Sequence, residues 1–343
     1  MPMSTPEVTT QPPGASEQAT EPEPALRAWL RANTRAEQLR DAGLPLAVLA
    51  LIVYFTFNSA VFLTVTNFQN VGLQAAALAL VAFGQCFVIL TAGIDLSVGS
   101  TVALVSVVSA QVMVDHGILP GIAAGLAIGL AVGIVNGLVV TRLGVVPFVA
   151  TLAMLSIASG LALELSGGTP VTGMPQTFTS IAQKRVFEVP VPVLISFALF
   201  LAAWGALRFT RLGRHLYAVG GNAEAARLSG VHVKRVTLSA YVVCSLFAAC
   251  GALLLTMRVA SGQPTLGTSL ALESVAAVVL GGVSLFGGRG SVVGVFFGVA
   301  FVSILGNGLN LSGVSSYTQM LIIGAALIAV LAIDRRIGRN QQE

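Results

Sequence analysis

The segment RFTRLGRHLYAVGGNAEAARLSGVHVKR, residues 208–235, is the one long polar stretch between apolar runs in this sequence. It carries six arginines and lysines, and an apolar run lies on each side of it. Its middle part can form a short helix, because Asn222 is a good helix N-cap and Gly230 a good helix stop. In a membrane protein, such a segment is expected to lie in the cytoplasm and to contact a partner.

Composition places the chain among membrane proteins. Hydrophobic residues make up 55% of the 343 residues and charged residues 9%, whereas a soluble domain has about 25% charged residues. Apolar runs close to the ~20 residues that a helix needs to cross a bilayer recur, and the alternation of an outer-membrane barrel is absent. The sequence therefore predicts an all-α, polytopic transmembrane helical bundle of about ten spans. We place these spans at 44–64, 70–91, 97–114, 118–140, 145–165, 190–207, 236–257, 270–286, 290–309 and 315–333. The third and eighth are short enough to be broken or re-entrant, so nine or eleven spans are the alternatives.

The basic residues indicate the orientation, because cytoplasmic loops of membrane proteins are enriched in lysine and arginine. With a cytoplasmic N-terminus, fifteen of the eighteen basic residues fall inside, and only Lys184, Arg185 and Arg258 fall outside. We therefore expect both termini and the 208–235 loop in the cytoplasm. The net charge of +4 follows from this bias and gives no reason to expect a nucleic-acid partner.

The ends of the chain differ in composition from the transmembrane domain at 44–334. Residues 1–24 are rich in Pro, Glu, Thr and Gln and are expected to form a disordered cytoplasmic tail. They lack the basic start and apolar core of a cleavable signal peptide. Residues 25–41 are either an interfacial helix with three arginines on one face or a frayed, solvated helix. Residues 335–343 are expected to form a second cytoplasmic tail.

An internal repeat relates the two halves of the domain. AGIDLSVGSTVAL (92–104) can be aligned with SGQPTLGTSLAL (261–272), and each is followed by a glycine series that leads to Asn-Gly-Leu, at 136–138 and 307–309. The copies cover spans 2–5 and 7–10. Because five spans separate their starts, they cross the membrane in opposite directions as inverted repeats. Inverted repeats are a common construction of transporters, whose halves rock about a site at the membrane midplane.

Glycines recur every four residues in the spans at 118–140 and 290–309. Small residues at this spacing lie on one helix face and let helix backbones approach closely. We therefore expect these spans to be central packing helices; smooth walls of a pathway are a compatible alternative. The packing glycines include Gly125, Gly129 and Gly133 in the first span, and Gly294 and Gly298 in the second.

Single polar residues within the apolar runs are candidates for lining a translocation path, because polar groups at membrane depth usually face a cavity or a partner. Structural roles are the alternative. Asp95 can cap the helix that follows it, Glu273 suits the N-terminus of a helix at the outer side, and the asparagines can form interhelical hydrogen bonds. The candidates are Gln85, Asp95, Asn136, Glu273, Asn307 and Asn310.

We identify no catalytic residue, metal site or cofactor site in the sequence. The three cysteines lie in apolar runs without a CxxC pair, and the three histidines are scattered over different loops. No chain of buried carboxylates or histidines indicates a proton relay. Neither Lys184 nor Lys234 completes the phosphate-binding pattern G-x-x-x-x-G-K-[ST]. If transport is driven by ATP, a separate subunit must bind the nucleotide.

Four motifs together resemble the permease subunits of ribose-type ABC sugar importers, and the match runs in order over residues 44–334. They are GIDLSVGS (93–100), GRHLYAVGGNAEAARLSGV (213–231), LESVAAVVLGGVSLFGGRGSVVG (272–294) and NGLNLSGVSSYTQML (307–321). The resemblance implies a multi-pass protein of the cytoplasmic (inner) membrane. Its implied partners are ATP-binding cassette subunits, a periplasmic or surface-tethered sugar-binding protein and a second permease, either an identical copy or a paralogue. The family's ATPase-coupling segment corresponds here to Gly220, Gly221, Asn222, Glu224, Ala225, Ala226, Arg227 and Gly230.

The resemblance further implies a transporter subunit, not an enzyme, that moves a monosaccharide by alternating access. The helix at 222–230 would transmit the movement of the ATPase subunits. Glu224 and Arg227 would face the ATPase, and the small side chains of Ala225 and Ala226 would allow it to approach closely. An ABC permease for branched-chain amino acids or nucleosides is the nearest alternative, and an ion-coupled carrier that works alone is a second.

The topology can be tested by cysteine labelling. Cysteines introduced near Arg214 and near Lys184 should react with a membrane-impermeant reagent from opposite sides of the membrane, because the charge bias places these residues in different compartments. Labelling of both from one side would contradict the ten-span arrangement.

Overall fold

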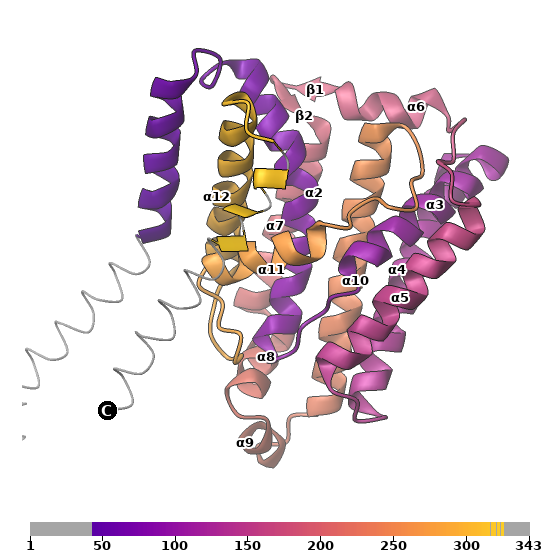
Figure 1. The fold of residues 1–343 in the computed structure, drawn as a ribbon. Coiled ribbons are helices and arrows are strands. Elements are labelled where there is room, and N and C mark those ends of the chain that lie inside the picture. The colour runs from indigo at the N-terminus through magenta and orange to yellow at the C-terminus, as the bar shows by residue number, and fades with distance from the viewer. Residues whose placement is uncertain (1–42, 316, 320, 323, 326–343) are drawn as a thin grey trace, which may run out of the picture. The chain divides into compact units, whose positions relative to one another are not determined.

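The computed structural model describes residues 43–315, 317–319, 321–322 and 324–325. Over these residues it is a bundle of α-helices with one hairpin of two short strands, in agreement with the predicted fold class (Figure 1). The segments assigned to tails or to an interfacial helix, at 1–24, 25–41 and 335–343, lie outside the described residues.

Seven helices of the described residues are long and apolar enough to cross a membrane. They match predicted spans 2–7 and 9. The first predicted span coincides with a shorter apolar helix, Gly43–Asn58, and most of the tenth lies outside the described residues, so the total of ten stays a prediction. The seven helices are α2 (Val65–Leu90), α3 (Val98–His116), α4 (Ile118–Thr141), α5 (Pro147–Ser166), α7 (Val191–Phe209), α10 (Val233–Val259) and α12 (Val292–Leu311).

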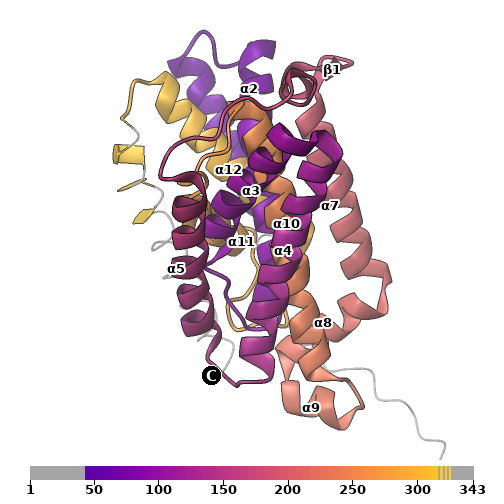
Figure 2. The same ribbon diagram turned by 90° about the vertical axis from the view of Figure 1, so that its right-hand side faces the viewer.

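Shorter elements mark the two ends of the bundle (Figures 1 and 2). At one end, here called the α9 end, lie α8 (Arg211–Gly221) and α9 (Ala223–Leu228). At the other, here called the hairpin end, lie α6, η1 and the antiparallel pair of β1 and β2. The bounds of these last four elements are Gln176–Thr179, Ser180–Gln183, Arg185–Val186 and Val189–Pro190.

The basic residues within the described part of the chain separate between the two ends as the positive-inside rule assigned them to opposite sides of the membrane. The basic residues of α8 and α9, of the α4–α5 connection and of the loop before α12 lie at the α9 end. Lys184 and Arg185 lie at the hairpin end, and Arg258, in the last turn of α10, lines a pocket there.

The eighth predicted span contains α11 (Leu270–Leu280), which is too short to cross a bilayer by itself. The irregular backbone before it runs along α3, where the N–H of Gln263 donates to Ser106 Oγ at 3.1 Å. Gly267 then lies directly against Gly99 in the first turn of α3. Helix α11 therefore begins inside the bundle, and Glu273 in its first turn lies there, not at the outer end where the sequence placed it.

Helices α2 and α10 run in opposite directions and pack against each other (Figures 1 and 2). Each is followed by an alanine with a positive φ, Ala92 at 60° and Ala260 at 53°, and then by irregular backbone that leads to a further helix. This arrangement agrees with two inverted halves. The repeat in the sequence stays a prediction.

Helix α2 is the most buried of the long helices. Of its most apolar 18 residues, 83% are buried, against 28% for α4 and 44% for α12. The prediction that the two glycine-rich spans are the central helices is therefore wrong for the single chain.

The glycine faces of both spans nevertheless make the close contacts that their spacing predicts. A Cβ atom on Gly129 would lie 2.6 Å from the Cβ of Ala249, and one on Gly133 would lie 2.7 Å from the Cα of Val242, both on α10. Gly125 lies less tightly against α3, where an added Cβ would be 3.2 Å from the Cβ of Ser109. On α12, Gly294 and Gly298 contact backbone carbonyls at Gly281 and in α11.

Replacement of either α4 glycine by leucine should separate α4 from α10. We expect Gly129→Leu and Gly133→Leu to lower the free energy of unfolding by roughly 1–3 kcal/mol or more, because the α10 backbone occupies the space that the new side chain needs. The measurement is the yield of folded protein and its thermal unfolding in detergent. Gly160→Leu on α5 is the control, since no atom lies within 4 Å of the added Cβ. Equal stability of all three variants would show that α4 packs loosely.

Candidate functional site

The 208–235 segment folds into two helices that meet at Asn222. The Oδ1 of Asn222 accepts the N–H of Ala225 at 2.9 Å and starts α9, and the positive φ of Gly230, 83°, follows its end. The predicted helix, with its cap and its stop, is therefore present.

Helix α8 precedes α9, and the sequence interpretation missed it. Its buried face is formed by Gly213, Leu216 and Val219, spaced every three residues. Leu216 and Val219 join the main hydrophobic core, so α8 is bound firmly to the bundle. The apolar spacing within an otherwise basic stretch is the signal that would have revealed this helix.

The C-terminal end of α8 contacts two backbone segments that are far away in the sequence. Gly220 lies against the carbonyl of Leu90 at the end of α2, and a Cβ on it would lie 2.5 Å from the amide nitrogen of Gly288. The N–H of Gly288 donates to the same Leu90 carbonyl at 3.0 Å. The hydroxyl of Tyr217 donates to the carbonyl of Gly290 at 2.7 Å. We call this contact of residues 90–92, 217–221 and 287–290 the junction.

The glycines of the junction allow backbone to meet backbone. Gly287 and Gly288 have φ values of 83° and 71°, which favour glycine, and a Cβ on Gly288 would lie 2.7 Å from the Cα of Gly221. No flexible side chain separates the three segments at these contacts. We therefore expect a displacement of α8 to strain the end of α2 and the loop before α12, because interiors packed this closely transmit strain.

The loop that joins α11 to α12 is a part of the site that the sequence interpretation missed. The stretch SLFGGRG (284–290) was noticed only as part of a family motif. Its glycine run is the signal, because closely spaced glycines mark backbone that turns sharply or approaches another segment closely. The sequence could not show which segment this loop approaches, because that segment, residues 90–92, follows a different helix.

The exposed surface of α9 consists of Ala223, Glu224, Ala225, Arg227 and Leu228. Ala226 is only 5% exposed and packs into the chain's own core, so the expectation that its small side chain faces a partner is wrong. Leu228 was not singled out in the sequence, yet it is 74% exposed.

Glu224 and Arg227 bind each other on this surface. The Nε of Arg227 donates to Oε2 of Glu224 at 3.0 Å, and the side chains are 65% and 63% exposed for Glu224 and Arg227. This hydrogen bond lowers the pKa of Glu224 and raises that of Arg227. Exposed pairs of this kind contribute little stability, so both side chains are available to a partner.

Asp95 lies in a buried network of polar groups at the start of α3. Its Oδ1 accepts the N–H of Ser97 at 2.9 Å and the Ser97 hydroxyl at 2.6 Å, and its Oδ2 accepts Asn136 Nδ2 at 3.3 Å. The carboxylate thus fixes the turn that enters α3 and links it to α4. All three side chains are essentially inaccessible within a single chain.

Two other candidates for the path are also buried between helices. Asn307 exchanges two hydrogen bonds with Asn67, at 2.9 and 3.0 Å, which join α12 to α2. Gln85 is fully buried and accepts the thiol of Cys244 at 3.5 Å. Glu273 and Asn310 are the two candidates with accessible side chains. Within the described residues, no group of three or more His, Cys, Asp or Glu side chains could hold a metal ion.

Comparison with known proteins assigns the bundle and its junction to a family. Residues 67–331 match the family profile described as the permease component of the branched-chain amino acid transport system. The chain belongs to this permease family. Relatives of this chain are named for the import of other solutes, so the family description alone does not identify the solute.

Curated relatives of the permease match it over most of its length. The ribose import permease protein RbsC of Escherichia coli K12 is 41% identical over 85% of this chain and 92% of its own length. RbsC of Bacillus subtilis 168 is 41% identical over 87% of this chain and 94% of its own length. The galactose/methyl galactoside import permease protein MglC of Haemophilus influenzae is 34% identical over 89% of this chain and 97% of its own length. No solved structure matches the chain.

The predicted class of protein is therefore confirmed: the chain is a transporter subunit and not an enzyme. It is a multi-pass protein of the inner membrane. As the permease of an ABC importer, it works with ATPase and solute-binding partners.

The junction of the permease can be tested with two neighbouring glycines. Gly220→Ala should lower the thermal unfolding temperature and the rate of uptake, because its methyl group would overlap the Leu90 carbonyl. We expect a loss of roughly 1–3 kcal/mol in the free energy of unfolding. Gly221→Ala is the matched control, with no atom within 4 Å of the new Cβ. If both variants unfold and transport like the wild type, the junction opens without cost and is not a rigid link.

Proposed function

We propose that this permease carries a monosaccharide across the inner membrane by alternating access, driven by ATPase subunits that dock on α9. The α9 end faces the cytoplasm, both termini lie there, and the path runs along the axis between two copies of the chain. The helix α9, with Gly220, Gly221, Asn222 and Gly230 around it, is the coupling element.

The junction is the observation that carries this proposal. A movement imposed on α9 passes through Asn222 into α8, and from Gly220 into the end of α2 and the loop before α12. These two connections reach one helix of each inverted half. A push from one partner therefore acts on both halves together, as rocking of the two halves requires.

The orientation is supported by the distribution of charge. The α9 end has most of the basic residues of the described part of the chain, and cytoplasmic loops are the ones enriched in lysine and arginine. The α9 end is also where an amphipathic helix and an exposed ion pair offer a polar surface to a soluble subunit.

The choice of solute is supported by the relatives. Relatives with 34–41% identity include permeases named for ribose import, D-allose transport and galactose import. The family description favours branched-chain amino acids as the second candidate. Uptake of labelled ribose, allose, galactose and leucine by the reconstituted transporter, each with its cognate binding protein, separates the two classes. ATP-dependent uptake of leucine alone would contradict the sugar proposal.

The path between two copies must be lined by residues on the surface of each chain. Gln85, Asp95, Asn136 and Asn307 are buried within one chain and are better explained as internal packing groups. Glu273, in the first turn of α11, and Asn310, near the end of α12, remain as candidates for the path. The permease needs no tight sugar pocket, because in this arrangement the binding protein selects the solute.

The docking surface can be tested with two adjacent alanines. Ala225→Trp should leave the permease folded and inserted but abolish ATP-driven uptake, because the indole would protrude from the exposed face of α9. Ala226→Trp should instead damage the permease itself, because its side chain is buried. The measurements are uptake, co-purification of the ATPase subunit and thermal unfolding of the isolated permease.

Leu143→Trp controls for added bulk at the α9 end, since Leu143 is 74% exposed in the α4–α5 connection. Normal uptake and an intact complex with Ala225→Trp would show that the ATPase does not contact this face of α9.

A further inference from the structure

Helices α2 and α10 carry buried polar atoms that have no hydrogen-bond partner. Among the described residues there are three such side-chain atoms, Gln85 Nε2 on α2 and the hydroxyl oxygens of Tyr241 and Ser245 on α10. All three side chains are inaccessible within the chain. A buried polar group without a partner destabilises the conformation that contains it, and most such groups in folded proteins are paired. The conformation described here therefore carries a cost that is confined to these two helices.

The Tyr241 hydroxyl lies beside the segment that leads from α2 into α3. A Cβ added to Gly93 would lie 2.8 Å from the Tyr241 oxygen. Two residues further along, the carboxylate of Asp95 has room for another donor. Its Oδ1 accepts two bonds from Ser97, but its Oδ2 accepts only Asn136, at 3.3 Å, and a carboxylate can accept about four hydrogen bonds. A buried donor and a buried acceptor thus lie on neighbouring segments without being paired to each other.

Both segments are connected to the α9 end of the bundle. Residues 90–92, directly before Gly93, belong to the junction with α8. Helix α10 follows α9 after the short connection 229–232, in which the N–H of Val231 donates to the Ala226 carbonyl at 3.0 Å. A displacement at the α9 end therefore reaches Tyr241 and the segment before α3 by two different connections. We expect it to shift one against the other.

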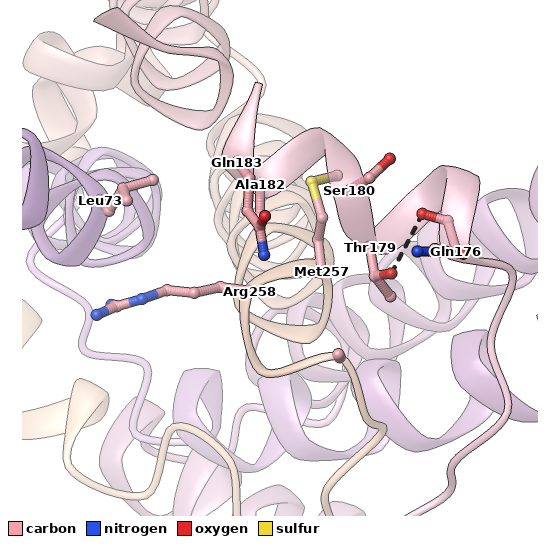
Figure 3. A pocket seen from close by; sticks show the side chains of 9 residues that line it. Leu73, Gln176, Thr179, Ser180, Ala182, Gln183, Met257 and Arg258 are labelled. Atoms are coloured by element: carbon pink, nitrogen blue, oxygen red, sulfur yellow. Dashed lines mark hydrogen bonds between the residues drawn. The ribbon is translucent and has the colours of Figure 1, made fainter. Parts of the chain in front are cut away.

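The same two helices meet again at the hairpin end. Leu73 of α2 and Met257 and Arg258 of α10 line one pocket of about 230 Å³ there (Figure 3). Figure 3 shows Arg258 extending from α10 toward Leu73. Because α10 is one continuous helix from Val233 to Val259, a shift at Tyr241 along α2 also changes the separation of these side chains. The pocket therefore provides a place to measure movement between the two helices.

We infer that Tyr241 is a positioning residue for transport, whose hydroxyl is unpaired in this conformation and donates to Asp95 in a second one, in which α10 has shifted against the start of α3. The unpaired hydroxyl destabilises the first conformation, and a hydrogen bond to a buried carboxylate stabilises the second. Both effects act in the same direction, so this one hydroxyl shifts the equilibrium between the two conformations. The inference rests on the proposed function, because alternating access supplies the second conformation.

Three tyrosines allow a matched test of stability, because a change to phenylalanine removes only the hydroxyl. Tyr241→Phe should raise the thermal unfolding temperature of the purified permease, on the order of 2 °C, because it removes a buried group without a partner. Tyr217→Phe should lower it, because this hydroxyl donates to the Gly290 carbonyl at 2.7 Å. Tyr54 is 59% exposed, so Tyr54→Phe should unfold and transport like the wild type.

Transport is measured with the complete transporter in proteoliposomes, with its ATPase subunits and the cognate solute-binding protein. Tyr241→Phe should slow ATP-driven uptake about tenfold, the factor that corresponds to one hydrogen bond to a charged group, while the complex still assembles. Asp95→Asn should also slow uptake, and the double variant should be no slower than Asp95→Asn alone, because both changes remove the same bond. If Asp95→Asn does not fold, the stability and uptake of Tyr241→Phe still decide the question.

Movement between α2 and α10 is measured by cross-linking of Leu73→Cys to Arg258→Cys with a short bifunctional reagent, in a chain whose half-buried Cys250 is replaced by alanine. The rate should differ between the nucleotide-free and the vanadate-trapped transporter. Tyr241→Phe should reduce this difference, which a purely structural role of the hydroxyl would leave unchanged.

An unfolding temperature of Tyr241→Phe equal to or below that of the wild type would show that the hydroxyl is already paired, to a side chain or a buried water, and would overturn this inference. Wild-type uptake by Tyr241→Phe would overturn it as well. In both cases, normal ATP-driven uptake by the unmodified transporter leaves the proposed function intact. If the unmodified transporter takes up no monosaccharide with ATP, the proposed function fails together with this inference.

Discussion

The contact of Gly220 with the Leu90 carbonyl and the Gly288 amide is the constraint on which the rest of the arrangement depends. It joins a surface helix to the end of the most buried helix and to the loop before α12 without a side chain between them. Backbone packed this closely cannot yield by rotating a side chain, so we expect strain on one segment to reach the other two. The neighbouring Gly221 has no atom within 4 Å of an added Cβ, so at the end of α8 the close contact requires glycine at position 220 and not at 221.

The interior of the bundle shows how the chain tolerates polar groups at membrane depth. Asp95, Ser97 and Asn136 satisfy one another at the start of α3, and Asn67 and Asn307 do the same between α2 and α12. The contact between α2 and α10 is different. It relies on small residues, with Gly84 against the Cys244 carbonyl, and it includes the buried and unpaired hydroxyl of Tyr241 among the described residues. Shape, more than hydrogen bonding, holds the two antiparallel helices together.

The sequence predicted what depends on local pattern. The apolar runs gave the helical class and seven helices long enough to span, and Asn222 and Gly230 gave the bounds of α9. The predictions from the sequence were wrong where the position or burial of a residue depends on which segments pack together in the fold. The glycine spacing of α4 predicted close packing but not a peripheral position, and nothing local to Ala226 shows that α10 and α8 cover it. For the same reason, the sequence alone assigned no role to SLFGGRG, since only the fold shows that this loop lies against Gly220.

The exposed side chains that could contact partners lie at the two ends of the bundle. This arrangement fits the proposed permease, whose partners supply the energy and select the solute. The α9 end offers an exposed ion pair, a leucine and a helix fixed to the moving parts. The hairpin end carries an exposed phenylalanine, Phe187, in the turn between β1 and β2. Between them the polar side chains mostly satisfy each other, and aromatic residues are only 7% of the chain. A tight sugar site needs several polar groups that converge on one pocket. This use of the interior polar groups for packing agrees with the proposal that the binding protein selects the solute.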